Sequence, residues 1–237
     1  PLVKVPLKEY RLDLDAMAQA VTERTRLIFV CNPNNPTGTI VTAAEVAAFV
    51  DRVPDHALIV LDEAYCELVA SDLFPESLAY IRQGRANVMV LRTFSKVYGL
   101  AGVRLGYGVA VPSVLAPLAE IREPFAVNRL AQAAGLAALT DTAFLEKTVT
   151  ANHQGRLFLY HAFDRLGLPY IESHTNFVLV EVGPQADQVG QCLFDAGIRV
   201  RPCAGSTRYT AQRGYRAGSG CPPARPSPGA RRRPRSR

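Results

Sequence analysis

The 237-residue chain contains no tryptophan, two methionines and five scattered cysteines. None of the cysteines forms a C-x-x-C pair, so the sequence offers neither a zinc-binding pattern nor a disulfide framework. No apolar run approaches the roughly 18–20 residues that a membrane-spanning helix requires. The opening residues, PLVKVPLKEY, lack the apolar core of a signal peptide. We therefore expect a protein of the reducing cytoplasm that has no membrane partner and no metal.

Acidic residues are absent from the last 32 residues of the chain, 206–237, which hold nine arginines and no Leu, Ile, Val or Phe. The rest of the chain has 18 basic and 21 acidic residues, a net charge of −3, although the whole chain is formally +6. Such a segment cannot offset its ordering entropy by apolar burial, so we predict a disordered tail over 206–237. Arg, Pro, Gly, Ala and Ser all have GC-rich codons, so a frameshift in a GC-rich gene would give this composition, and we favour that origin. The alternative is a basic arm that binds nucleic acid.

Apolar residues make up 48% of the chain and charged residues 20%, which is enough for a sizeable core. Short β-branched runs alternate with stretches of helical spacing, and Thr42 with Glu45 fits a capping box. This alternation predicts an α/β fold with a mostly parallel sheet in a large domain, 1–145, followed by a smaller α+β domain, 146–205. The expected strands are 26–31, 57–61, 87–92, 104–110, 176–182 and 198–202, and the expected helices are 42–53, 114–122, 129–165 and 185–196.

Three polar loops directly follow three of the expected strands. They are Asn32-Pro33-Asn34-Asn35-Pro36-Thr37-Gly38, Asp62-Glu63-Ala64-Tyr65 and Thr93-Phe94-Ser95-Lys96, the last continuing into Gly99-Leu100-Ala101-Gly102-Val103-Arg104. In open α/β sheets, ligands bind at the carboxyl ends of the strands. We therefore expect the polar groups of all three loops to converge on one crevice.

The residue types in these loops suit an aromatic pyridine aldehyde phosphate. A lysine amine can form a Schiff base with an aldehyde, and a carboxylate can keep a pyridinium nitrogen protonated, so that the ring acts as an electron sink. Asn and Tyr can hydrogen-bond a phenolate oxygen, while hydroxyls and an Arg suit a phosphate. Asp62-Glu63 after an apolar strand also fits a Walker B strand of an ATPase. However, the chain has no G-x-x-x-x-G-K-[ST] loop, and the other two loops have no place in that scheme.

Together, NPNNPTG, LDEAY and RTFSKVYGLAGVRLGY resemble the signature of fold-type I, pyridoxal-phosphate-dependent aminotransferases of class I/II. They are most similar to the histidinol-phosphate aminotransferase family, and the resemblance covers residues 1–205. It implies the PLP-dependent transferase fold type I, pyridoxal 5′-phosphate as cofactor and a homodimer. It also implies transamination between histidinol phosphate and 2-oxoglutarate in histidine biosynthesis. An aromatic amino acid (phenylalanine) aminotransferase and a related threonine-phosphate decarboxylase remain alternatives.

The resemblance also implies a role for each motif residue. Lys96 would form the Schiff base and move the proton between the substrate α-carbon and the cofactor. Asp62 would pair with the pyridinium nitrogen, and Arg201 lies where family members approach the phosphate end of the substrate. The remaining cofactor contacts would be Asn35 and Tyr65 at the 3′-oxygen, and Thr93, Ser95 and Arg104 at the phosphate.

The chain departs from the family pattern at both ends. The family has an N-terminal arm, a glycine-containing phosphate loop and a stacking aromatic residue before the position of Pro1, and an Arg-bearing strand after Gly205. Because the chain opens in mid-pattern without Met, we expect a fragment with an exposed sheet edge that is poorly soluble and nearly inactive alone. A non-catalytic remnant is the alternative from a different class.

Overall fold

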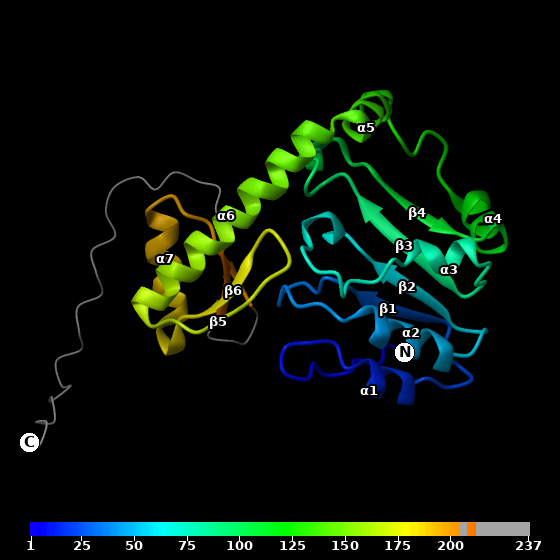
Figure 1. The fold of residues 1–237 in the computed structure, drawn as a ribbon, viewed down its shortest axis with the longest axis horizontal. Helices are drawn as coiled ribbons and strands as arrows, with labels where there is room; N and C mark the ends of the chain where they lie inside the picture. The colour runs from blue at the N-terminus through cyan, green and yellow to red at the C-terminus, as the bar shows by residue number, and fades with distance from the viewer. Residues whose placement is uncertain (204–207, 212–237) are drawn as a thin grey trace, which may run out of the picture.

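Two four-stranded sheets joined by a long helix make up the residues that the computed structural model describes, 1–203 and 208–211 (Figure 1). The first sheet has the order β1-β2-β3-β4. Strands β1, β2 and β3 are parallel, and β4 is antiparallel to β3. The predicted mostly parallel sheet is therefore confirmed. Its strands are Leu27–Cys31 (β1), Leu58–Asp62 (β2), Val88–Thr93 (β3) and Gly106–Ala110 (β4).

Helices α1 (Leu14–Gln19) and α2 (Ala43–Arg52) bury one face of the first sheet, and the short helix α3 (Leu78–Arg82) packs beside them. Helix α2 begins at the predicted capping box. The Thr42 hydroxyl accepts from the Glu45 amide at 3.3 Å, and the Glu45 carboxylate accepts from the Thr42 amide at 2.6 Å. The core between sheet and helices is made mostly of β-branched side chains, with one leucine and one phenylalanine: Val30, Ile59, Leu61, Val88, Val90, Val46, Phe49 and Val50.

Strand β1 is an edge strand and alternates between the two faces of the sheet. Ile28 and Val30 point into the core, whereas Leu27 and Phe29 are 55% and 61% exposed. Helices therefore cover β1 on one face only, among the described residues. The expected exposed sheet edge is present.

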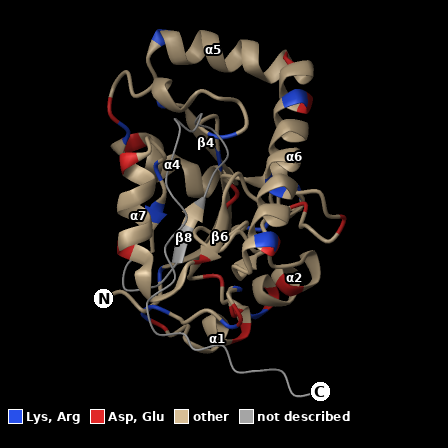
Figure 2. Ribbon diagram, turned by 90° about the vertical axis from the view of Figure 1, so that its left-hand side faces the viewer, with Lys and Arg blue, Asp and Glu red and all other residues tan. Residues whose placement is uncertain are grey.

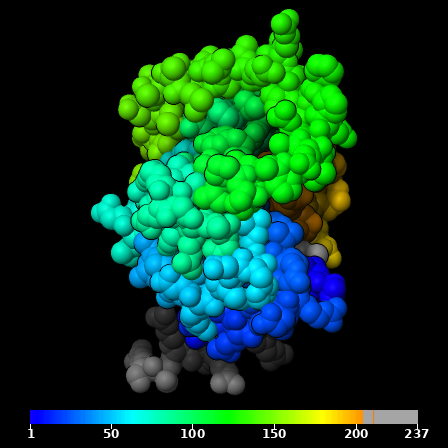
Figure 3. All heavy atoms as spheres, turned by 90° about the vertical axis from the view of Figure 1, so that its right-hand side faces the viewer, coloured from blue at the N-terminus to red at the C-terminus, as the bar shows by residue number. Residues whose placement is uncertain are grey.

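The helical stretch predicted over 129–165 is two helices, α5 (Arg129–Thr140) and α6 (Thr142–Leu166). Asp141 separates them because it has left the helical region, with ψ at 70°, and its side chain accepts from the Phe144 amide at 3.0 Å as an N-cap. Helix α5 carries a single charged residue, Arg129, at its start (Figure 2). It forms the upper part of the face in Figure 3 together with α4 (Pro112–Ile121).

The second sheet is antiparallel throughout, in the order β5-β6-β8-β7. Strand β8 lies inside the stretch for which a disordered tail is predicted, and its backbone pairs with β6 and β7. The other residues of the predicted tail, 206–207 and 212–237, lie outside the described residues. The elements are Tyr170–Ile171 (β5), Val178–Glu181 (β6), Ala186–Asp195 (α7), Arg201–Pro202 (β7) and Arg208–Ala211 (β8).

Helix α6 runs from the first sheet towards the second (Figure 1) and packs its side chains on both. The predicted domain division at residue 145 falls within this helix and stays a prediction. No helix within 1–203 and 208–211 is long and apolar enough to cross a membrane. Three 3₁₀ turns complete the elements: Cys66–Leu68 (η1), Ala101–Val103 (η2) and Gly183–Gln185 (η3).

Candidate active site

The loop after β1 is closed by its own side chains. Asn32 is 3% exposed, and its amide group both donates to the carbonyl of Val41 and accepts from the amide of Val41, each at 3.0 Å. Within the loop, Asn34 donates to the Thr37 hydroxyl at 2.8 Å. These bonds fix a loop whose ends would otherwise be free to separate, and they leave Asn35 exposed at its tip.

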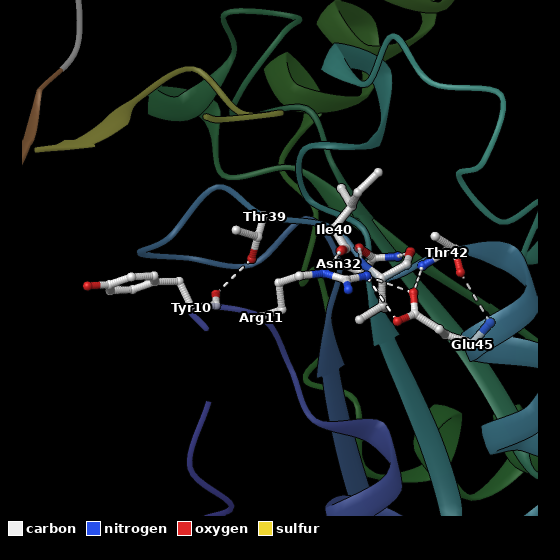
Figure 4. A network of polar contacts seen from close by, with 8 residues as sticks. Tyr10, Arg11, Asn32, Thr39, Ile40, Thr42 and Glu45 are labelled. Atoms are coloured by element: carbon white, nitrogen blue, oxygen red, sulfur yellow. Dashed lines mark hydrogen bonds and ion pairs between the residues drawn. The ribbon is translucent and has the colours of Figure 1, made fainter. Parts of the chain in front are cut away.

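The N-terminal segment hydrogen-bonds to the residues that directly follow this loop (Figure 4). Thr39 donates from its hydroxyl to the carbonyl of Tyr10 at 2.9 Å, and Arg11 donates from Nε to the carbonyl of Ile40 at 3.1 Å. The Arg11 guanidinium also pairs with Glu45 at 2.8 Å, which connects the segment to the start of α2. The loop is thus held from both sides.

Tyr65 connects the first loop to the third. Its phenol oxygen accepts a hydrogen bond from the side-chain amide of Asn35 at 3.1 Å. The Nζ of Lys96 lies 5.0 Å from the centre of the Tyr65 ring, within range of a cation–π contact. The structure therefore brings Asn35, Tyr65 and Lys96 together, as the sequence predicts.

Asp62, Thr93, Ser95, Lys96 and Arg104 line one hollow of about 440 Å³ at the carboxyl ends of β2 and β3. Here the Asp62 carboxylate accepts from the Ala64 amide at 3.2 Å, and the Thr93 hydroxyl accepts from the Ser95 amide at 3.0 Å. The predicted convergence of the second and third loops is present. Beside it, burial raises the pKa of the Cys31 thiol, which keeps that neighbour of Asp62 uncharged.

Arg104 has a left-handed backbone conformation, with φ 59° and ψ 59°, which is uncommon for a residue other than glycine. Its guanidinium donates to the carbonyl of Ala101 at 2.7 Å, so the η2 turn holds the exposed side chain at the rim of the hollow. Strained backbone conformations of this kind cluster at functional sites. Nothing in the sequence pattern indicated this conformation.

A buried ion pair that the sequence analysis did not single out lies next to the hollow. Arg92 donates from Nε and Nη2 to one carboxylate oxygen of Glu63, at 3.0 and 2.8 Å, and the Glu63 side chain is 1% exposed. Burial raises the pKa of the nearby Glu67 carboxyl, and Arg92 counters that rise. The signal was the position of each residue, since Glu63 follows Asp62 and Arg92 precedes Thr93.

The second sheet reaches the first loop through the segment Ser173–Phe177. The His174 amide donates to the Gly38 carbonyl at 2.8 Å. The Phe177 ring meets the Tyr65 ring edge-on, with centroids 5.5 Å apart. The buried Arg156 of α6 holds this segment by donating to the carbonyl of Thr175 at 2.9 Å.

Lys96 also lines a second hollow, of about 360 Å³, between α6 and β6, together with Lys147, Arg156 and Asn176. Arg201, by contrast, lies exposed on β7 and lines neither hollow of the described chain that contains Lys96. The suggested contact of Arg201 with substrate stays a prediction.

Comparisons with known proteins agree with this arrangement. The model of the family "Aminotransferase class I and II" matches residues 1–213. The histidinol-phosphate aminotransferase of Moorella thermoacetica is 52% identical over 199 residues, which are 84% of this chain and 52% of that protein. Histidinol-phosphate aminotransferase 2 of Ralstonia nicotianae is 52% identical over 203 residues, 84% of this chain and 54% of that protein. The chain thus spans about half the length of the curated relatives it matches.

Among solved structures, histidinol-phosphate aminotransferase from Sinorhizobium meliloti in complex with pyridoxal-5′-phosphate superposes with a TM-score of 0.83 at 35% identity. That match covers 90% of this chain and 59% of the other. The expected fold type I architecture is confirmed. The fold, the converging loops and the family match lead to one conclusion: the chain belongs to the aminotransferase class I and II family.

Proposed function

We propose that this chain is the cofactor-binding part of a histidinol-phosphate aminotransferase. The enzyme would transfer an amino group between histidinol phosphate and 2-oxoglutarate, giving imidazole acetol phosphate and glutamate. One observation carries the proposal: a carboxylate, an amine, two hydroxyls and a guanidinium from separate loops line a single hollow. This donor set fits pyridoxal 5′-phosphate, which when bound supplies a ring that withdraws electrons from the substrate α-carbon.

Each side chain has a distinct task in this proposal. Asp62 carries the negative charge that would hold a proton on the ring nitrogen, and the Ala64 amide fixes that carboxylate. The hydroxyls of Thr93 and Ser95, with the guanidinium of Arg104 at the rim, would bind the phosphate through charge-assisted hydrogen bonds.

Lys96 supplies the reactive amine. It lies between the cofactor hollow and the second hollow, so its Nζ can meet the cofactor on one side and a substrate on the other. A lysine in this place can bind the cofactor aldehyde covalently and can hold or release the proton of the substrate α-carbon. Asn35 and Tyr65 would present an amide donor and a phenol to the ring oxygen.

The substrate is assigned from the relatives. Those 44–52% identical to the chain are described as histidinol-phosphate aminotransferases. Because the chain spans about half of their length, the activity is proposed for the protein at their full length. A competition assay between histidinol phosphate and phenylalanine, on a protein extended to that length, tests which of the two is the substrate. Preference for phenylalanine would favour the aromatic alternative.

The cofactor assignment is tested by reduction. The chain is incubated with pyridoxal 5′-phosphate, treated with borohydride, and digested for peptide mapping. We expect the cofactor on the peptide that contains Lys96, no trapping in Lys96→Ala, and unchanged trapping in Lys147→Ala, whose lysine lines the second hollow only. Covalent trapping that persists in Lys96→Ala would contradict the proposal, and absence of trapping in the unaltered chain would favour a non-catalytic remnant.

We further propose that the enzyme is a cytoplasmic homodimer, as the family resemblance implies. Light scattering on the protein extended to its relatives' length is expected to give a molar mass twice that of one chain. A monomeric mass at micromolar concentration would contradict this.

Binding to nucleic acid through the arginine-rich segment is the rival hypothesis. It predicts salt-sensitive association with nucleic acid that deletion of 206–237 abolishes.

A further inference from the structure

We propose that the Glu63–Arg92 ion pair is a positioning element, which sets the spacing between the carboxylate of Asp62 and the loop that carries Lys96. The inference rests on the proposed function, because the pair lies beside the proposed cofactor site. The geometry of the pair itself does not depend on that function.

The pair joins the ends of two neighbouring strands where both loops begin. The Glu63 amide donates to the Leu91 carbonyl at 2.9 Å, so the ladder between β2 and β3 continues one residue past β2. The side chains then add a second connection, because Nε and Nη2 of Arg92 converge on the same oxygen of Glu63. Two donors on one acceptor fix the direction of the carboxylate as well as its distance.

The ion pair lies on the opposite side of the sheet from the residues that it positions. Asp62 is in register with Leu91, and Thr93 follows Leu91 by two, so Asp62 and Thr93 share a face. Arg92 alternates to the other face, where it is in register with Tyr107 of β4. Arg92 also lines part of the hollow, so the pair lies at its edge and holds the two strand ends together from the other face.

The residue after each partner of the pair makes a hydrogen bond that fixes part of the site. One residue after Glu63, the Ala64 amide holds the Asp62 carboxylate. One residue after Arg92, the Thr93 hydroxyl holds the Ser95 amide, next to Lys96. Loosening the pair should therefore release both amides together.

The burial of Glu63 makes the pair costly to break on one side only. Its second carboxylate oxygen has no hydrogen-bond partner within the described residues, so Arg92 is the group that neutralises it there. Removing Arg92 alone leaves a buried carboxylate unpaired and destabilises the fold, whereas neutralising both partners removes that penalty. A double variant can thus separate stability from positioning.

The test compares Arg92→Met with the double variant Glu63→Gln/Arg92→Met, first without cofactor. Urea unfolding measures stability, and residue-resolved amide exchange measures Ala64 and Ser95 against core amides of β2 and β3. We expect Arg92→Met to lower stability. We expect the double variant to recover most of that loss while both loop amides still exchange about tenfold faster than in the unaltered chain. Arg82→Met, which breaks the exposed Arg82–Glu76 pair on α3, is the matched control and should leave these amides unchanged.

With cofactor, the same double variant should bind pyridoxal 5′-phosphate about tenfold more weakly, the lower end of the effect that supporting residues have on bound groups. Loop exchange within twofold of the unaltered chain in the double variant would overturn the positioning role and leave the pair with a stability role only. Failure of the proposed function gives a different result, because cofactor trapping on Lys96 would then be absent whatever the exchange rates show.

Discussion

Gly38, the last residue of the first loop, gives the sharpest test of how that loop meets the second sheet. Its φ of +77° lies in the left-handed region, and a Cβ built on it would overlap the Ser173 hydroxyl and lie 2.7 Å from the Ser173 Cβ. Gly38→Ala therefore combines backbone strain with a steric clash. Gly84 has almost the same φ, +78°, but nothing within 4 Å of its Cβ position, so Gly84→Ala carries the strain alone.

The two contributions can be put in numbers. A left-handed conformation costs a residue other than glycine about 1–2 kcal/mol. An overpacked contact typically adds about 1–3 kcal/mol, since Ser173 is buried and its neighbours must shift. The lower entropy of the unfolded alanine chain offsets about 0.4–1 kcal/mol in both variants alike. We expect Gly84→Ala to cost about 1 kcal/mol and Gly38→Ala about 2–4 kcal/mol of unfolding free energy.

Urea denaturation followed by far-UV circular dichroism measures both changes. With a slope of about 1–3 kcal/mol per molar urea, the difference between the variants is about 1 M in midpoint. Ser173→Gly removes the overlapping atoms, but it also removes the hydroxyl that accepts from the Thr175 amide at 3.0 Å. The clash is therefore measured as non-additivity: Gly38→Ala should cost less in the Ser173→Gly background than in the unaltered chain. Equal midpoints for Gly38→Ala and Gly84→Ala would refute the close contact between the loop and residue 173.

Three further changes test other parts of the structure. Asn32→Ala leaves the buried amide and carbonyl of Val41 without partners, so we expect a loss of about 3 kcal/mol in urea unfolding, and a loss under 1 kcal/mol would contradict the two bonds. Thr42→Ala removes the cap of α2 and should cost about 1 kcal/mol, whereas Glu45→Gln preserves the box and should cost less. Burial lowers the pKa of His174, so the unfolded chain binds its proton first as pH falls below about 6.5. Between pH 7.5 and 5.5, the unaltered chain should therefore lose more unfolding free energy than the His174→Gln variant does. Identical pH profiles of stability for the two proteins would contradict this.

Local patterns were sufficient for the elements that depend on local chemistry. The β-branched runs predicted β1 to β4 to within two residues, and Thr42 with Glu45 predicted the start of α2. The convergence of the loops followed from a rule of parallel sheets, since polar residues placed after adjacent strands must meet at one edge. The sequence was informative here because strand ends and loop chemistry occur within a few residues of each other.

Features that depend on distant partners were not predictable in this way. The Asp141 break, by contrast, is local, because its side chain caps the next helix through the amide of Phe144. Strand β8 is defined by its backbone pairing with β6 and β7, and the sequence does not show which strands it meets. The Glu63–Arg92 pair likewise joins residues of two neighbouring strands, whose approach residue spacing alone does not encode.

The segment Ser173–Phe177 connects the second sheet to the first loop and to Tyr65. That segment meets Gly38 through the His174 amide and Tyr65 through the Phe177 ring, so the second sheet contacts two loops of the site at once. A displacement of the second sheet must therefore move Gly38, Tyr65 or both, and Tyr65 in turn holds Asn35. Because the contact at Gly38 leaves no room for a Cβ, the displacement would be passed to the loop and not absorbed by a side chain. The loop in this way connects the two sheets.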